Sequence, residues 1–139
     1  MKKRESVTHI MTKNVMTLNI TDSLEQAESL MKKHKIRHIP VVSGDKLVGM
    51  LSLTDLLRIS FVDHYGEQET SMDTVVYDIL TISQVMVANP EAVTKDQTIR
   101  EVAEMLATKE YHALPVVDGD TLVGIVTTTD LINYLLDQY

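Results

Sequence analysis

The stretch Gly49-Met50-Leu51-Ser52-Leu53-Thr54-Asp55 returns later in the chain as Gly124-Ile125-Val126-Thr127-Thr128-Thr129-Asp130. The two copies lie 124 − 49 = 75 residues apart, and each follows a Pro-Val-Val run and a Gly-Asp turn, at residues 40–45 and 115–120. A duplication of this regularity indicates two copies of one supersecondary unit. The chain is therefore interpreted as two repeats of the same unit.

The composition argues against several classes of protein. Of the 139 residues 44% are hydrophobic, and the formal net charge is −7. This charge disfavours a nucleic-acid-binding protein, which needs a basic surface. The chain has no cysteine, so neither a disulfide framework nor a thiolate metal site is expected. No apolar run approaches the roughly 20 residues that span a bilayer. We expect a cytoplasmic protein that binds neither a membrane nor nucleic acid.

Both copies show the same order of strands and amphipathic helices. Ser23 and Thr98 begin capping-box sequences, and apolar residues at i, i+3 and i+7 follow each of them. Two apolar runs divided by Gly-Asp then predict a hairpin, and the Ser/Thr-x-x-Asp motif begins a second helix. A β-α-β-β-α unit of about 55 residues buries too little apolar surface to fold alone. The expected fold class is α/β (α+β), with two β-α-β-β-α repeats packed with pseudo-twofold symmetry.

The expected domain boundaries follow the repeat. Residues 1–65 form the first repeat and residues 82–139 the second, and the two together form one module. Residues 66–81 form a linker whose polar part is expected to be solvated. Its apolar end is expected to form either a short packing helix or a contact with another chain.

The repeated Ser/Thr-x-x-Asp motif supports two interpretations. A hydroxyl residue three positions before a carboxylate is a helix N-cap with a capping-box partner, which alone explains Ser52 with Asp55 and Thr127 with Asp130. The same geometry suits a ligand, because a hydroxyl group and free amides at a helix N-terminus bind phosphate. The nearby carboxylate can also accept hydrogen bonds from both hydroxyls of a ribose. Residue order leaves both interpretations open.

The order of motifs resembles a known family. Met-Thr, a capped helix, Pro-Val-Val, a Gly-Asp turn, Leu-Val-Gly and Ser/Thr-x-x-Asp occur in this order over residues 7–60 and 82–136. This order resembles the cystathionine-β-synthase (CBS) domain, and the tandem resembles the pair called a Bateman module. The resemblance implies a regulatory module that binds AMP, ADP, ATP, S-adenosylmethionine or a cyclic dinucleotide in a cleft between the repeats. It also implies a homodimer, and an effector protein that senses the change in conformation on binding.

The resemblance also implies which residues hold the ligand. It assigns the ribose to Asp55 and Asp130, and assigns help with phosphate to the two hydroxyl residues, Ser52 and Thr127. It further assigns phosphates to the basic residues before each proline, which are Arg37, His38 and His112.

The two sites are expected to be unequal. In the resembled family, phosphates beside one repeat's aspartate are often met by basic residues before the other repeat's proline. By that pattern the Asp130 site faces Arg37 and His38, and only His112 faces the Asp55 site. The Asp130 site should then prefer the more anionic ligand, because only arginine carries a permanent charge and a bidentate fork.

The alternative function is a ligand-free dimerisation or protein-interaction scaffold. We do not expect this protein to be an enzyme, because the residue order suggests neither a Ser-His-Asp triad nor a pair of catalytic carboxylates. His34 and His38 have a spacing that could hold a metal on one helix. The residue before a proline disfavours helix, so the approach to Pro40 spoils that geometry, and no metal site is expected. No cofactor is required beyond an adenine nucleotide as regulatory ligand.

Overall fold

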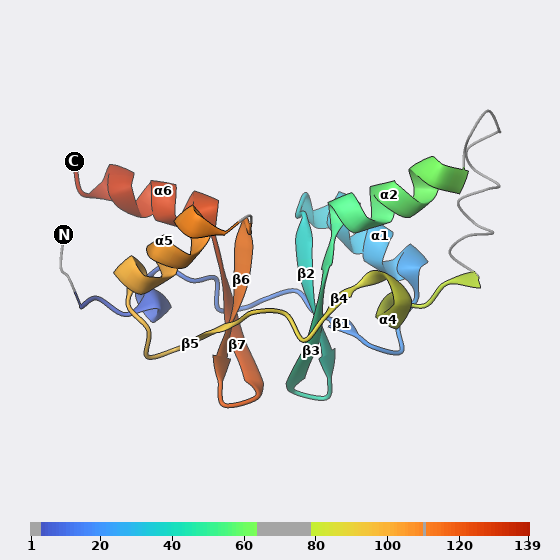
Figure 1. Cartoon of the computed structure of the whole chain (residues 1–139), viewed down its shortest axis with the longest axis horizontal. Helices are drawn as coiled ribbons and strands as arrows, with labels where there is room; N and C mark the ends of the chain where they lie inside the picture. Colours follow the sequence, from blue (N-terminus) through green and yellow to red (C-terminus); the bar gives the residue numbers. More distant parts are fainter. Residues whose placement is uncertain (1–3, 64–78, 110) are drawn as a thin grey trace. The chain divides into compact units, whose positions relative to one another are not determined.

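The computed structural model describes residues 4–63, 79–109 and 111–139. The chain divides into two compact units. The first unit contains residues 16–90, and the second contains residues 1–15 together with residues 91–139. Figure 1 labels the helices and strands of both units.

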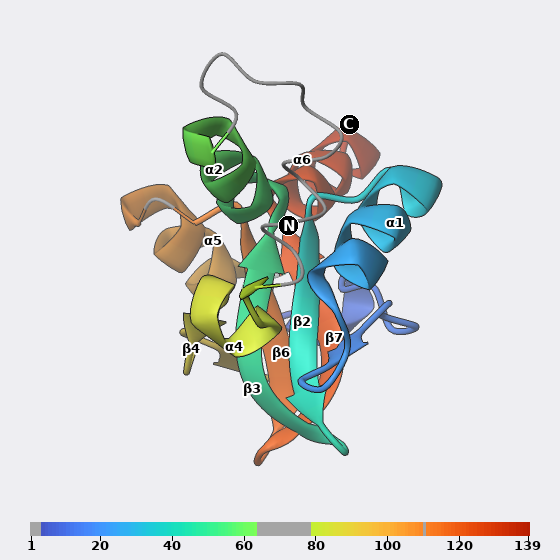
Figure 2. The ribbon, with the colours of Figure 1, turned by 90° about the vertical axis from the view of Figure 1, so that its right-hand side faces the viewer.

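The first unit is built on an antiparallel hairpin. Strands β2 (His38–Ser43) and β3 (Lys46–Ser52) form the hairpin, and β1 (Leu18–Asn19) adds to β2 in parallel. The short strand β4 (Val87–Ala88) adds to β3 on its other edge. Among the described residues of this unit, helices α1 (Leu24–His34), α2 (Leu53–Asp63) and α4 (Ile82–Val85) lie beside the hairpin (Figure 2).

The second unit repeats this arrangement. Strands β6 (Ala113–Asp118) and β7 (Thr121–Thr127) form its hairpin, and β5 (Val93–Thr94) adds to β6 in parallel. Helices α5 (Ile99–Thr108) and α6 (Thr128–Asp137) pack on this hairpin, and the short 3₁₀ helix η1 (Val7–His9) joins them from the N-terminal end of the chain. The expected mixed α/β fold with two β-α-β-β-α repeats is confirmed.

Local sequence signals account for the helix starts and the turns. Gln26 donates its backbone N–H to Ser23 Oγ at 3.1 Å, while Gln26 Oε1 accepts the backbone N–H of Ser23 at 2.8 Å. Thr98 makes the same reciprocal capping box at the start of α5, so both predicted boxes are confirmed. The hairpin turns contain Gly44 and Gly119, each with φ of +65°, a left-handed conformation that glycine adopts without steric cost.

Several predicted bounds need correction. The runs Val15-Met16-Thr17-Leu18 and Glu91-Ala92-Val93 predict the first strand of each repeat, but β1 begins only at Leu18 and β5 at Val93. Helices α2 and α6 begin directly after Ser52 and Thr127, so the predicted helix start at the Ser/Thr-x-x-Asp motif is confirmed. Residues 66–78 of the expected linker lie outside the described part of the chain.

The compact units do not follow the repeat boundaries at 1–65 and 82–139. Val7 is fully buried and lies in the apolar cluster of the second unit, together with Val93, Val102 and Val126. Ile82, which is 82 − 7 = 75 residues later, is fully buried in the cluster of the first unit. Each unit is therefore completed by the first segment of the other repeat, which motif positions alone do not reveal.

Methionine and glycine make the contacts between each of these segments and its hairpin. Met86 lies directly over Gly49 of β3, and Met11 lies over Gly124 of β7. A Cβ on Gly124 would meet Met11 Sδ at 2.5 Å and the carbonyl oxygen of Thr12 at 2.9 Å. That carbonyl accepts the N–H of Ile125 at 3.0 Å, and Thr12 N–H donates to the carbonyl of Ile125 at 2.8 Å. A side chain at either glycine is incompatible with this packing.

We therefore expect Gly124→Ala to destabilise the protein more than Gly49→Ala. Overpacking costs about 1–3 kcal/mol, and at Gly124 a hydrogen-bonded backbone carbonyl, as well as a flexible thioether, would have to move. Urea unfolding of both variants measures the difference. Equal stability of the two variants would contradict the role assigned to the Thr12 carbonyl.

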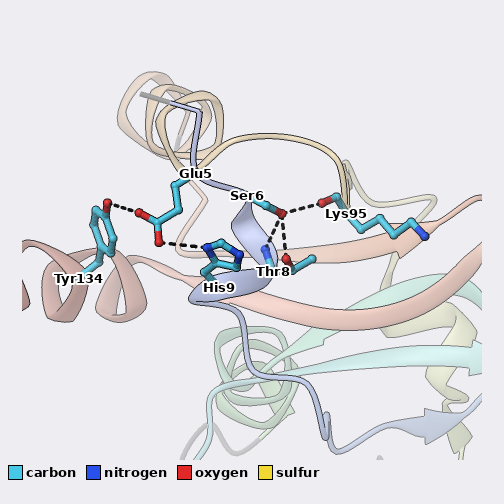
Figure 3. A network of polar contacts seen from close by, with 6 residues as sticks. All are labelled: Glu5, Ser6, Thr8, His9, Lys95 and Tyr134. Carbon is cyan, nitrogen blue, oxygen red and sulfur yellow. Dashed lines mark hydrogen bonds and ion pairs between the residues drawn. The ribbon is translucent and has the colours of Figure 1, made fainter. Parts of the chain in front are cut away.

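Within the second unit, a polar network joins the N-terminal segment to α6 and to the loop at Lys95 (Figure 3). Tyr134 of α6 donates its hydroxyl to Glu5 Oε1 at 2.7 Å, and His9 Nδ1 lies 3.0 Å from Glu5 Oε2. Ser6 Oγ donates to the carbonyl of Lys95 at 2.9 Å. The residues equivalent to Glu5 and Tyr134, 75 positions away, are Leu80 and Ile59, and both pack on the apolar cluster of the first unit. One unit thus uses a carboxylate and a phenol where the other uses two aliphatic side chains.

This network predicts a loss of stability at alkaline pH. The hydrogen bond to Glu5, burial and the charge of Glu5 raise the pKa of Tyr134 in the folded protein. A raised pKa means that the phenol stabilises the fold fully below its ordinary pKa of about 10, and that this contribution disappears as pH rises through the folded pKa. The parent should exceed Tyr134→Phe in stability near pH 8, and the difference should shrink by pH 11.

Urea midpoints of the two proteins across this range check the prediction, because the other tyrosines ionise equally in both. A difference that stays constant from pH 8 to pH 11 would show that the phenol proton contributes nothing.

Candidate functional site

The first candidate site is the N-terminus of α2. Asp55 N–H donates to Ser52 Oγ at 3.1 Å, and Asp55 Oδ2 accepts the backbone N–H of Ser52 at 3.2 Å. The side chain of Asp55 is 16% exposed. The strand therefore ends and the helix begins at one reciprocal capping box, which fixes the aspartate beside the first helical turn.

The N-terminus of α6 has the same geometry. Asp130 N–H donates to Thr127 Oγ1 at 3.1 Å, and Asp130 Oδ2 accepts the N–H of Thr127 at 2.9 Å. The capping interpretation of both motifs is thus confirmed. The ligand interpretation remains a prediction, and it is compatible with the caps because each box uses the Oδ2 atom and leaves Oδ1 outside the box.

The structure brings Arg37 and His38 next to the first of these helix starts. The carbonyl of Arg37 accepts the N–H of Leu53, the first residue of α2, at 2.8 Å. His38 pairs with Ser52 across the β2–β3 ladder. The Arg37 side chain is exposed and the His38 side chain half-buried. Two groups that can carry positive charge therefore lie on the chain segment beside the Ser52–Asp55 box.

His112 occupies the corresponding place in the second unit. Its carbonyl accepts the N–H of Thr128 at 3.0 Å and the hydroxyl of Thr128 at 3.3 Å. Ala113, the position equivalent to His38, pairs with Thr127 across the β6–β7 ladder. The second helix start thus has one exposed histidine beside it, where the first has an arginine and a histidine. The backbone hydrogen bonds and strand pairing are the same in both units, and only the side chains beside the helix start differ.

Sequence reasoning missed one charged residue at these sites. Arg58 lies one turn into α2, and its Nη1 is 3.8 Å from Asp55 Oδ1. The equivalent residue of α6, 58 + 75 = 133, is Asn133. The i, i+3 spacing from the aspartate was a signal that could have identified this pair, because residues at that spacing are neighbours on a helix.

The described ranges contain neither a metal cluster nor a membrane span. No group of three or more His, Asp or Glu side chains among these residues could hold a metal ion. His34 ends α1, and Lys35, with φ of 54°, turns the chain away before His38 begins β2, so the two histidines do not share one helix. None of the helices placed by the structure is long and apolar enough to cross a membrane.

The sequence model of the CBS domain matches residues 7–61 and 82–137 of this chain. The chain therefore belongs to the CBS domain family and carries two copies of the domain in tandem. This establishes the resemblance that the order of motifs indicated.

Known relatives support the assignment. The chain is 32% identical to the CBS domain-containing protein YhcV of Bacillus subtilis over 127 residues, which are 91% of this chain and 82% of YhcV. It is 31% identical over 144 residues to the uncharacterized protein MJ1404 of Methanocaldococcus jannaschii. That match covers 97% of this chain but spans only a third (33%) of the length of MJ1404.

Solved structures agree with the fold. The CBS domain pair of protein MJ0100, crystallised in complex with 5′-methylthioadenosine and S-adenosyl-L-methionine, superposes with a TM-score of 0.77 at 25% identity. The superposition covers 96% of this chain and 98% of that one. The tandem CBS pair is thus the class of protein that the fold and the duplicated motif define.

Proposed function

We propose that this chain is a regulatory module that binds an adenosine-containing ligand at the N-termini of α2 and α6. The observation that carries the proposal is the duplicated hydroxyl–carboxylate box, which holds Asp55 and Asp130 with one carboxylate oxygen outside each box. A ribose diol can donate to such a carboxylate, and the positive end of the helix dipole beside it suits a phosphate. The MJ0100 pair, whose two ligands both contain adenosine, supports the same ligand class.

The charge beside each box bears on which adenosine compounds bind. AMP, ADP, ATP, S-adenosylmethionine and cyclic dinucleotides share the ribose and adenine but differ in charge. Arg37, His38 and His112 would contribute to the binding of phosphorylated members of this class. A ligand that favours one conformation of the chain shifts the population towards it, and an effector protein or domain would sense that shift. Catalysis forms no part of the proposal.

A second candidate function is a dimerisation scaffold. Helices α2 and α6 expose large apolar side chains, with Leu57 58% exposed, Ile132 51% and Leu136 65%. Large apolar side chains that gather on one surface mark interaction sites in soluble proteins. We propose a homodimer that buries these helices, and this proposal is compatible with ligand binding as well as with a ligand-free scaffold.

Thermal unfolding against a panel of adenosine compounds separates the two functions. A ligand that binds only the folded protein raises stability by RT ln(1 + [L]/Kd). We expect at least one compound of the panel to raise the midpoint. A chain that elutes at dimer mass while no compound shifts its midpoint would support the scaffold and contradict the binding function.

Asp55→Ala and Asp130→Ala are each expected to weaken binding of the best ligand about tenfold or more while the protein stays folded. Hydrogen bonds to a charged acceptor contribute roughly 1.5–3 kcal/mol each. Titration calorimetry measures the loss. Glu101→Ala is the matched control, because Glu101 is the carboxylate of the same capping box in α5 and lies outside the proposed sites.

If both aspartate variants and their double variant bind as tightly as the parent, the two carboxylates are only helix caps. A loss of affinity in Glu101→Ala of similar size would assign the effect to a lost cap in general.

Arg37→Ala is expected to weaken ATP binding more than adenosine binding. The guanidinium can make a charge-assisted, bidentate contact with a phosphate, whereas adenosine has no phosphate. Calorimetric titration of the variant with both compounds measures the difference. Arg100→Ala removes the same charge from another exposed arginine and serves as the control.

An equal loss for ATP and adenosine would contradict the phosphate role of Arg37. Unchanged affinities for both compounds would place Arg37 outside the site.

A further inference from the structure

The two repeats differ three residues after the aspartate of the duplicated motif. In the first unit, Arg58 Nη1 lies 3.8 Å from Asp55 Oδ1. In the second unit the equivalent residue is Asn133, a neutral amide. Both helices have the same type of capping box, which uses Oδ2 of the aspartate. The two units therefore differ in the side chain that is available beside the other carboxylate oxygen, Oδ1.

The oxygens of the two carboxylates are used differently. Asp55 Oδ2 accepts the N–H of Ser52, and its Oδ1 has the guanidinium beside it. Asp130 Oδ2 accepts the N–H of Thr127. Within the part of the chain that the structure describes, no ion pair is formed by Asp130. At Asp55 the oxygen outside the capping box, Oδ1, therefore lies beside a cation. At Asp130 the corresponding oxygen has no ion-pair partner among the described residues.

A ribose diol would depend on this oxygen. Two adjacent hydroxyls donate best when both carboxylate oxygens can accept. At 3.8 Å the guanidinium makes an ion pair and no hydrogen bond with Oδ1, but it attracts the negative charge to which a ribose hydroxyl would donate. The Arg58 side chain is 71% exposed, so the competing contact is weak and a ligand can displace it. A weak exposed ion pair corresponds to a change in affinity of roughly two- to fivefold.

We propose that Arg58 is a specificity-determining residue of the Asp55 site. It competes with a ligand's ribose for Asp55 Oδ1, so the Asp55 site binds a neutral nucleoside more weakly than the Asp130 site, where Asn133 replaces the arginine. The inference rests on the proposed binding function and assigns an order of affinity to its two sites.

A reciprocal exchange of the two residues tests the inference with adenosine as the probe. Adenosine is neutral, so attraction between Arg58 and a phosphate does not enter the measurement. Arg58→Asn is made in an Asp130→Ala background and Asn133→Arg in an Asp55→Ala background, so that calorimetry reports one site at a time. Arg58→Asn should strengthen adenosine binding about two- to fivefold, and Asn133→Arg should weaken it by a similar factor.

Salt provides a readout that a merely structural role of Arg58 would not change. Raising the ionic strength from about 0.05 to about 0.5 M screens the exposed ion pair, and adenosine affinity at the Asp55 site should therefore rise. In the Arg58→Asn protein the same change of salt should leave the affinity nearly constant. Arg100→Asn in the Asp130→Ala background removes the same charge elsewhere on the surface and should behave as its parent.

The outcomes distinguish this inference from the binding function. Adenosine binding in both backgrounds with no effect of either exchange would overturn the role of Arg58 and leave the binding function standing. A change in thermal midpoint without a change in affinity would assign Arg58 to helix stability and overturn the inference. Failure of adenosine, AMP and ATP to bind the unsubstituted protein would overturn the binding function and this inference together.

Discussion

The packing of a methionine onto a glycine is the contact on which each unit of this protein depends. A repeat of about 55 residues buries too little apolar surface to be stable alone. Met11 lies over Gly124 and Met86 over Gly49, and in each case the methionine belongs to the first segment of the other repeat. Because glycine has no Cβ, the backbone of that segment can approach the strand closely enough to pair with it. The duplication is thus joined by exchange of segments, and neither repeat contains its own complete core.

The reciprocal capping box then determines where the chemistry lies. The box ends β3 and β7 and begins α2 and α6 at one pair of side chains, so it places a carboxylate beside the first helical turn in both units. The same contact that starts the helix therefore prepares the proposed ligand site. This dual use explains why a structural interpretation and a functional one fit the same four residues, and why substitution must be compared with a cap elsewhere in the chain.

The duplicated halves have become unequal at specific positions. Glu5 and Tyr134 form a hydrogen bond where Leu80 and Ile59 are apolar. Arg58 stands where the other helix has Asn133. Neither change disturbs the backbone geometry that the repeats share, because all six residues lie outside the two hairpins. Two units with the same backbone fold but different side chains can therefore give the two proposed sites different affinities.

The sequence by itself determined the repeat, the β-α-β-β-α order, the capping boxes and the family. All of these follow from sequence signals that each span a few residues, and the copy 75 residues later repeats each signal. Only the tertiary structure decided which segment completes which unit, because Val7 and Ile82 are buried by residues far away in the chain. It also decided that Glu5 bonds to Tyr134, 129 residues later. A contact across such a separation leaves no periodic signal in the sequence, since its geometry exists only after the chain has folded.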